Sequence, residues 1–321
     1  MPERRGAPPG TLAAAMTRDA SMQSYLTIRW LADRAYRADA FALYAYFRWL
    51  DDTVDERLVD RDERLTFVAR QRNLLARAVD GAMPTDLSAV DVSPEEALLV
   101  GLARPAGANL ADAGGLLLSL RSMLDVMEFD ARRRGRAVTQ DELDAYTHDL
   151  AVAVTEALHH CIGHGRGCPH DESRYVAVTG AHVAHMLRDL AEDLAAGYVN
   201  VPAELVADGD VSLEDLHTPE LRAWVRDRVE LARSCFATGR RYLAGVENAR
   251  CRLAGHAYIA RFEWVLDAVE RDGYRLRPGY PERATFRGGL TIAADGARSA
   301  LAARRTRSQR ASAAALREVA R

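Results

Sequence analysis

The stretch from Ala40 to Glu56 reads AFALYAYFRWLDDTVDE. Its large apolar and aromatic residues recur at the three- and four-residue spacing of a helix that buries one face. The stretch then turns acidic, although carboxylates at the C-terminal end of a helix oppose the helix dipole. Asp51 and Asp55 are four residues apart and share one helix face, where two like charges repel each other. A divalent cation between them would remove this repulsion, whereas a solvated acidic helix end is the simpler alternative.

Helical signals continue on both sides of this stretch. Ser93 followed by Glu96, and Thr139 followed by Glu142, have the spacing of a capping box at the start of a helix. Alternating runs of β-branched residues bounded by turn residues are almost absent, so a sheet is not expected. The sequence therefore predicts an all-α protein, with further helices at about residues 62–80, 109–133, 172–196, 218–239 and 241–272.

The loops give no sign of a second domain. None is long or simple enough in composition to be an interdomain linker. A fixed-period repeat is also absent, which argues against a helical solenoid. We therefore expect one helical domain over residues 20–290, preceded by a flexible arm over residues 1–19 and followed by a tail rich in Ala and Arg over residues 291–321.

Composition excludes several classes of protein. The 321 residues carry a net charge of −3, too near zero to indicate a nucleic-acid partner. No apolar run has the length of a transmembrane helix, and Met1–Gly10 lacks the apolar stretch of a signal peptide. We therefore expect a cytoplasmic protein whose contact with a membrane, if any, is peripheral. All 43 basic residues are Arg, so an anion held by a side-chain cation must meet a guanidinium or a protonated His.

A second acidic motif lies much later in the chain. Residues Arg188–Asp193 read RDLAED, so Asp189 and Asp193 again share a helix face, with Arg188 beside this motif as Arg48 is beside the first. Hard carboxylate oxygens suit Mg²⁺ together with a phosphate. If the two helices face each other, the motifs would bracket several Mg²⁺ ions and a diphosphate and favour its loss from an allylic carbon. Apolar side chains between them would hold a prenyl tail.

A run of His and Cys lies between residues 159 and 170. Its spacing is compatible with zinc, but no second group of ligands of the CxxC type accompanies it. His near a helix C-terminus is favourable in itself, so we favour a structural interpretation. The residues concerned are His159, His160, Cys161, His164, Cys168 and His170.

Several motifs match one known family in order and spacing. Tyr44–Glu56 is similar to YAYCRxxDDxxDE, and Leu187–Asp193, followed by Gly197 and Pro202, is similar to LRDxxED…GxxYLP. Further matches are Met127–Asp130, Glu142–Tyr146 and Ala257–Tyr274. Together these stretches cover about residues 20–290 and resemble the squalene/phytoene synthase family of isoprenoid synthases.

This resemblance implies the all-α isoprenoid-synthase fold, a single-domain helical bundle around a central cavity. It also implies Mg²⁺ as cofactor and an allylic prenyl diphosphate as substrate. Tyr146 matches the family's tyrosine in the reaction cavity, where it would donate a hydrogen bond, stabilise a cation or transfer a proton. The residues implied to bind Mg²⁺ are Asp51, Asp55, Asp189 and Asp193, and those implied to hold diphosphate are Arg48 and Arg188.

The chain departs from the family pattern at four positions near the expected acceptor. His182 and His185 stand where the family has Gln and a metal-binding Asn, and Val152 and Thr155 add bulk where the family has small residues. An imidazole nitrogen is a poor match for Mg²⁺. We therefore expect His185 to border the metal cluster and to act on the acceptor or on the diphosphate. Ionisation should be retained, while the second prenyl site should be altered.

Three functions remain open at this point. We slightly prefer transfer of one prenyl group to a non-isoprenoid, hydrophobic or aromatic acceptor, as in squalene-synthase-like carbazole prenyltransferases of secondary metabolism. The alternative is head-to-head condensation of two prenyl diphosphates to a squalene- or phytoene-type hydrocarbon. A non-catalytic helical binding module is a distant alternative, because all four aspartates are intact. The sequence indicates neither the prenyl chain length nor the oligomeric state.

Overall fold

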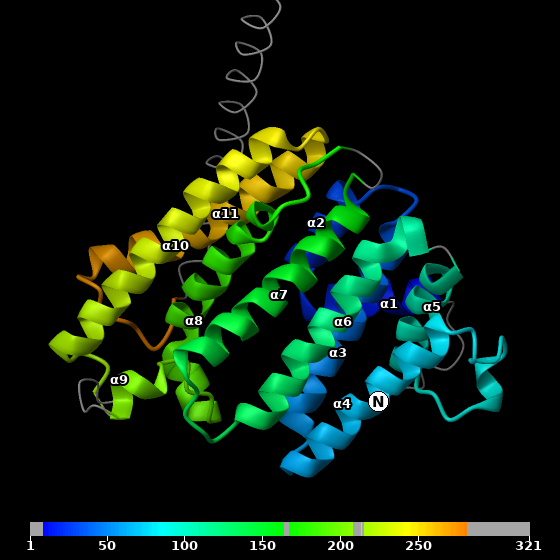
Figure 1. Ribbon diagram of the computed structural model, residues 1–321, viewed down its shortest axis with the longest axis horizontal. Coiled ribbons are helices and arrows are strands. Elements are labelled where there is room, and N and C mark those ends of the chain that lie inside the picture. Colours follow the sequence, from blue (N-terminus) through cyan, green and yellow to red (C-terminus); the bar gives the residue numbers. More distant parts are fainter. Residues whose placement is uncertain (1–8, 109, 164–166, 208–212, 214, 281–321) are drawn as a thin grey trace, which may run out of the picture. The chain divides into compact units, whose positions relative to one another are not determined.

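Helices make up the regular structure of this protein (Figure 1). The computed structural model describes residues 9–280 except 109, 164–166, 208–212 and 214. Within these residues every regular element is a helix, and the extended backbone pairs once, in an isolated bridge between Val138 and Pro202. The prediction of an all-α protein is confirmed.

The chain forms two compact units. The first unit comprises Met1–Arg134 and His148–Gly165, and the second comprises Gly135–Thr147 and Arg166–Arg321. The boundary falls inside helix α7 (Gln140–Cys161), whose first residues belong to the second unit and whose remainder belongs to the first.

The first unit contains the helices before α7 in the chain. They are α1 (Pro9–Ala20), α2 (Met22–Leu31), α3 (Arg37–Asp52), the π-helix η1 (Thr53–Arg57), α4 (Arg61–Val79), the 3₁₀-helix η2 (Leu87–Ala89), α5 (Pro94–Ala108) and α6 (Leu110–Arg133). Helix α3 packs on α1 and α5, and α4 packs on α5 and α6. The large side chains that this packing buries fully include Tyr46, Leu50, Leu99 and Leu120.

A buried polar network joins three helices of this unit. The hydroxyl of Tyr46 on α3 donates to Gln71 on α4 at 3.2 Å, and Gln71 donates to Glu96 on α5 at 2.9 Å. Glu96 also closes the predicted capping box, because its carboxylate accepts from the backbone N–H of Ser93 at 2.9 Å. Buried polar groups need such partners. The network therefore fixes α3, whose end carries the first aspartate motif.

The N-terminal segment differs from the expected flexible arm over residues 1–19. Helix α1 begins at Pro9, and Ala13 and Thr17 are fully buried. The Thr17 hydroxyl donates to the carbonyl of Ala13 at 2.8 Å, so this polar group is satisfied within the helix. The tail over residues 291–321 lies outside the described residues, and the single domain over residues 20–290 stays a prediction.

The second unit contains the helices after α7. They are the 3₁₀-helix η3 (Glu172–Arg174), α8 (Val176–Ala196), α9 (Ala203–Ala207), α10 (Pro219–Gly245) and α11 (Ala249–Arg271). Helix α8 packs on α10 and α11, and α10 packs on α11. No helix in the described part of the chain is both long and apolar enough to span a bilayer.

A close approach between α8 and α10 explains one difference from the sequence prediction. A Cβ added at Gly239 would lie 2.6 Å from the Cβ of Ala177, so this contact requires glycine. Gly239 thus serves packing inside α10 and does not end the helix. The predicted break near residue 240 is wrong, and α10 continues to Gly245.

Candidate active site

The first aspartate motif lies where α3 changes into the π-helix η1. Asp51 and Asp52 end α3, and Asp55 lies within Thr53–Arg57. The Thr53 hydroxyl donates to the carbonyl of Trp49 at 2.7 Å, which holds the chain at this change. A π turn inside a helix is rare and often marks a functional site. Sequence analysis did not predict this turn, because no residue type there is specific for it.

Negative charge is concentrated in this motif. Burial and the neighbouring Asp55 raise the pKa of Asp51 to about 7, with smaller contributions from Asp130 and Asp52. Arg48 acts in the opposite direction: its guanidinium contacts Asp51 at 3.3 Å and Asp52 at 2.5 Å. With 46% of the Arg48 side chain exposed, solvent weakens this compensation. A cation bound here would relieve the remaining repulsion.

The second aspartate motif, at the end of α8, has a different setting. Both Nε and a terminal nitrogen of Arg188 contact the carboxylate of Asp189, and Nε2 of His185 lies 2.8 Å from Oδ2 of Asp189. Burial by itself would raise the pKa of Asp189, but the hydrogen bonds from Arg188 and His185 outweigh it and lower that pKa. This carboxylate is therefore held ionised by its own neighbours.

The other carboxylate of this motif has a neutral partner. Nδ2 of Asn200 donates to Oδ2 of Asp193 at 2.6 Å. Sequence analysis did not identify Asn200. The Gly197 that ends α8 was the available signal, because a chain that reverses there brings residues a few positions later back beside the helix end.

Aromatic rings of the second unit form a continuous row beside this motif. The Tyr146 and His182 rings meet edge to face at 5.0 Å, and His182 and His185 have centroids 6.5 Å apart. Phe262 on α11 lies 6.4 Å from His185, and its other neighbour is Tyr258 at 5.1 Å. Tyr146 and His182 are buried, and their place in a reaction cavity stays a prediction. The sequence motifs did not single out Phe262, because it is separated from α8 by more than 60 residues of chain.

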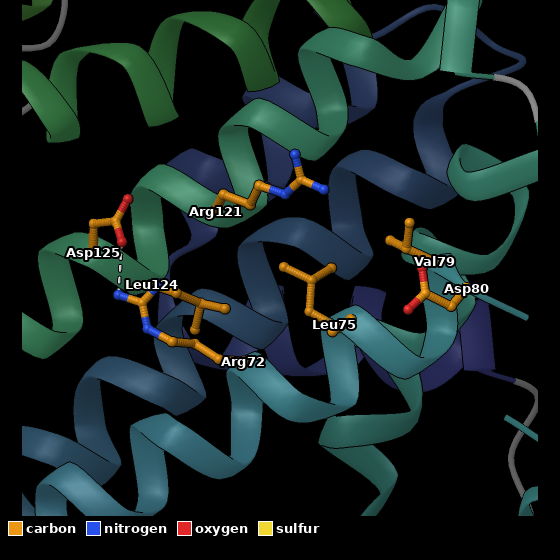
Figure 2. Close-up of a pocket in the computed structure, with 8 residues that line it drawn as sticks. Arg72, Leu75, Val79, Asp80, Arg121, Leu124 and Asp125 are labelled. Carbon is orange, nitrogen blue, oxygen red and sulfur yellow. Dashed lines mark hydrogen bonds and ion pairs between the residues drawn. The ribbon is translucent and has the colours of Figure 1, made fainter. Parts of the chain in front are cut away.

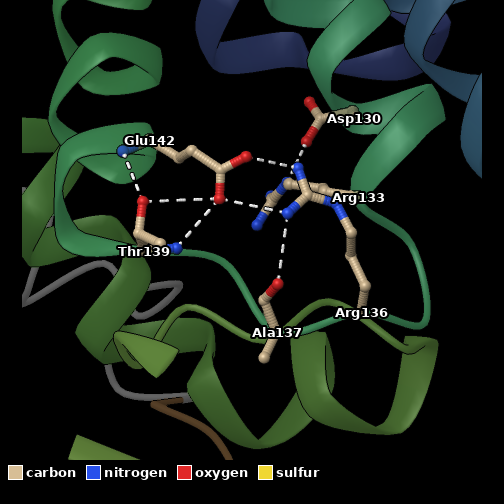
Figure 3. A network of polar contacts seen from close by, with 6 residues as sticks. All are labelled: Asp130, Arg133, Arg136, Ala137, Thr139 and Glu142. Atoms are coloured by element: carbon tan, nitrogen blue, oxygen red, sulfur yellow. Dashed lines mark hydrogen bonds and ion pairs between the residues drawn. The ribbon is translucent and has the colours of Figure 1, made fainter. Parts of the chain in front are cut away.

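A cap at the start of α7 positions Tyr146. The Arg136 guanidinium binds the Glu142 carboxylate at 2.7 and 3.0 Å, and the backbone N–H of Thr139 donates to it at 2.9 Å (Figure 3). Hydrogen bonds from Arg136 and Thr139 lower the pKa of Glu142 to about 2. Figure 3 also shows Arg133, which donates to Asp130 at 2.6 Å within the first unit.

The remaining two predicted site residues belong to the first unit. Val152 and Thr155 lie on α7, three residues apart, with exposed fractions of 6% and 4%. The Thr155 hydroxyl has no hydrogen-bond partner among the described residues. Their contribution to an acceptor cavity stays a prediction.

A groove in the first unit is lined by none of the predicted site residues. Arg121 and Leu75 both line this groove, and Arg72 is paired with Asp125 at 2.6 Å (Figure 2). Because each predicted site residue lies elsewhere, we do not assign the groove to the candidate active site.

The aspartate pairs suit Mg²⁺ by their chemistry. Mg²⁺ prefers hard oxygen ligands and is usually bound by one or two carboxylates together with substrate phosphate and water. The described residues contain no group of three or more His, Cys, Asp or Glu arranged to hold a metal ion. Two carboxylates per motif would fit an ion whose remaining ligands come from a diphosphate and water.

Known proteins of similar sequence and fold identify the family of this chain. A curated phytoene synthase from Thermus thermophilus is 30% identical over 145 residues, which cover 43% of this chain and 48% of that protein. The chain thus matches about half the length of that relative. The solved squalene synthase HpnC from Alicyclobacillus acidocaldarius has a TM-score of 0.66 at 23% identity, over 84% of this chain and 95% of that one. A dehydrosqualene synthase in complex with ligand has a TM-score of 0.66 at 15% identity, over 90% and 95% of the two chains.

These structures share the all-α isoprenoid-synthase fold with this protein. The family model for squalene/phytoene synthase, a family of prenyltransferase-type enzymes, matches residues 17–288. That range includes Asp51, Asp55, Asp189 and Asp193. The chain belongs to the squalene/phytoene synthase family.

Proposed function

We propose that this protein is a Mg²⁺-dependent prenyltransferase, which ionises an allylic prenyl diphosphate and forms a carbon–carbon bond. The observation that carries the proposal is the pair of DxxxD motifs, each with an Arg in contact with an aspartate, in a member of this family. Asp51, Asp55, Asp189 and Asp193 would hold the metal. Bound Mg²⁺ supplies positive charge that stabilises the departing diphosphate.

The arginines would bind the diphosphate itself. A guanidinium presents two parallel N–H donors to phosphate oxygens, and this chain has no lysine to share that task. Arg188 already makes such a two-pronged contact with Asp189, so it is held in place before substrate arrives. Arg48 is more exposed and would turn from Asp51 and Asp52 toward the anion.

The aromatic row would protect the carbocation. Ring faces attract positive charge, and the apolar edges exclude the water that would quench an allylic cation. Tyr146 is the hydroxyl-bearing member next to His182, so it would donate a hydrogen bond or accept a proton from the reacting carbon skeleton.

For the acceptor, we propose a non-isoprenoid aromatic compound of secondary metabolism. His182 and His185 in the aromatic row, and the bulk of Val152 and Thr155 on α7, support an acceptor unlike a second prenyl chain. Head-to-head condensation of two prenyl diphosphates is the second candidate, and family membership supports it to a comparable degree. A cytoplasmic location stays a prediction, as does peripheral contact with a membrane.

Product analysis tests both steps of the proposal. The purified chain is incubated with Mg²⁺ and dimethylallyl, geranyl, farnesyl or geranylgeranyl diphosphate, with and without a carbazole-type acceptor. We expect Mg²⁺-dependent diphosphate release and a prenylated acceptor by mass spectrometry. A C30 or C40 hydrocarbon from donor alone would establish head-to-head chemistry instead. Failure to release diphosphate from every donor would favour the non-catalytic binding module.

A further inference from the structure

Asn200 is a polar residue of the second unit with only 3% of its surface exposed. It follows the end of α8, where Gly197 adopts the left-handed conformation (φ 91°) and reverses the chain. The reversal returns Asn200 to the side of Asp193, to whose Oδ2 its Nδ2 donates at 2.6 Å. An aspartate of the second motif is thus in contact with a buried amide.

The backbone around Asn200 is fixed on both sides. Before it, the N–H of Gly135 donates to the carbonyl of Gly197 at 2.8 Å. After it, the N–H of Ala203 donates to the carbonyl of Val138 at 2.7 Å. Both bonds lead to the segment just before α7, within the same unit. The position of the amide is therefore set by the main chain and not by a flexible loop.

This amide differs in kind from the partners of Asp189. Arg188 contributes a positive charge to Asp189, whereas the amide of Asn200 is neutral and contributes a directed hydrogen bond to Asp193. Asp193 lies in the last turn of α8, where a carboxylate opposes the helix dipole. Helix stability thus gives no reason for this carboxylate. Holding it in one orientation is useful when a cation binds there.

We propose that Asn200 is a positioning residue, which holds the Asp193 carboxylate in the orientation that binds Mg²⁺. The inference rests on the proposed function, because it assumes that Asp193 is a metal ligand. Removal of a group that hydrogen-bonds to a metal ligand typically weakens metal binding by about 10–100-fold.

Asn200→Leu tests the proposal because it removes the donor and keeps a side chain that branches at Cγ. We expect Mn²⁺, used as a paramagnetic probe on the full chain, to bind at least about tenfold more weakly by EPR. The Mg²⁺ concentration for half-maximal diphosphate release should rise by a similar factor, with a smaller change in turnover at saturating Mg²⁺. The serine side chain in Asn200→Ser is too short to reach Asp193, so this variant should also bind Mn²⁺ more weakly. It is used in place of Asn200→Leu if that variant does not fold.

Two controls separate positioning from a general loss of structure. Asn248 caps α11 in the same unit, where its side chain accepts from the N–H groups of Arg250 and Cys251. Asn248→Ala should lower the melting temperature without changing Mn²⁺ affinity. In an Asp193→Ala background, Asn200→Leu should cause no further loss of Mn²⁺ affinity, because Asn200 acts through that carboxylate.

The outcomes distinguish this inference from the proposed function. Unchanged Mn²⁺ affinity in the Asn200 variants, beside a wild type that binds Mn²⁺ and releases diphosphate, would overturn the inference alone. A further loss in the Asp193→Ala background would also overturn it alone. A wild-type chain that neither binds Mn²⁺ nor releases diphosphate would overturn both.

Discussion

The first aspartate motif at the end of α3 and the second at the end of α8 have the same four-residue spacing. In the first, burial and Asp55 raise the pKa of Asp51 to about 7. In the second, hydrogen bonds from Arg188 and His185 outweigh burial and lower the pKa of Asp189. The same sequence pattern therefore occurs once with an aspartate whose pKa is raised despite a neighbouring Arg, and once with a leading carboxylate whose pKa is lowered by its neighbours.

The arginines account for much of this difference. The side chain of Arg48 is 46% exposed and divides its contacts between Asp51 and Asp52. The side chain of Arg188 is 14% exposed and directs two nitrogens at Asp189 alone. A partly buried, two-pronged pair is stronger than an exposed, divided one. The comparison predicts that a cation bound at the first motif would relieve more charge repulsion than a cation bound at the second.

The largest expected effect is loss of activity in either motif. Asp51→Asn and Asp189→Asn should each lower Mg²⁺-dependent diphosphate release by about 100-fold or more, because each removes a charged ligand needed at the departing group. The assay is release of diphosphate from the preferred donor. Asp125→Asn is the matched control, since Asp125 pairs with Arg72 in the first unit outside both motifs, and its activity should stay within about twofold. Wild-type release by either motif variant would contradict the proposed function.

A smaller effect is expected at His185, the group that the second motif has and the first lacks. His185→Asn should preserve or improve Mg²⁺-dependent binding of the donor, while transfer to the native acceptor falls by about tenfold or more. Donor binding is measured by calorimetry with Mg²⁺ and transfer by product yield. His217→Asn, an exposed site in the same unit, is the control. Loss of metal-dependent donor binding in His185→Asn would show that this histidine is a metal ligand after all.

Local features of both motifs could be predicted from the sequence. Helix ends, the shared face of Asp51 and Asp55, and the capping box at Ser93 each depend on residues within one or two turns of each other. Such features follow from helix geometry and from backbone groups left unpaired at helix ends. The structure accordingly has the box at Ser93 with bonds of 2.9 and 3.1 Å.

The partners that set each carboxylate's charge could not be predicted in the same way. Asn200 reaches Asp193 only because the chain reverses at Gly197, and Phe262 comes from another helix. The π turn at Thr53–Arg57 contains no residue type that is specific for a π turn. These features arise from tertiary packing, which short sequence patterns do not record.

Stability without metal should change in opposite directions in the two motifs. Asp51→Asn should raise the free energy of unfolding by about 1 kcal/mol, because it removes a charge that burial and Asp55 disfavour. The effect is small because solvent reaches this side chain and screens the charge. Asp189→Asn should lower it by about 1–2 kcal/mol, because Arg188 loses its charged partner in a partly buried place. Denaturant unfolding at pH 7 with EDTA measures both. Changes of the same sign would show that the two motifs do not differ as described.

The dependence of stability on acid pH is the last test of the comparison. The second unit contains His256, whose titration must be distinguished from that of the second aspartate motif. Burial, together with Arg240 and Arg252, lowers the pKa of His256 from 6.5 to about 4, against a smaller opposite effect of Glu263. The folded chain then binds fewer protons than the unfolded chain between these values, so stability falls as the pH falls through this window, by about 1 kcal/mol per pH unit.

His256→Phe should remove this slope, because it removes the titrating ring. Neither ring nitrogen of His256 has a hydrogen-bond partner among the described residues, so the substitution removes no hydrogen bond there. Denaturant unfolding at pH 7, 6 and 5 with EDTA measures the slope, and the exposed His217→Phe serves as the control with the slope retained. Asp189 should contribute to acid sensitivity only below about pH 4, because a carboxylate with a lowered pKa keeps its stabilising charge above that pH. Acid sensitivity that remains in His256→Phe below about pH 4 is therefore expected to include the contribution of Asp189. If the stability of His256→Phe still fell with the same slope between pH 7 and 5, groups other than His256 would cause the acid sensitivity. Stability at acid pH would then not distinguish the two motifs.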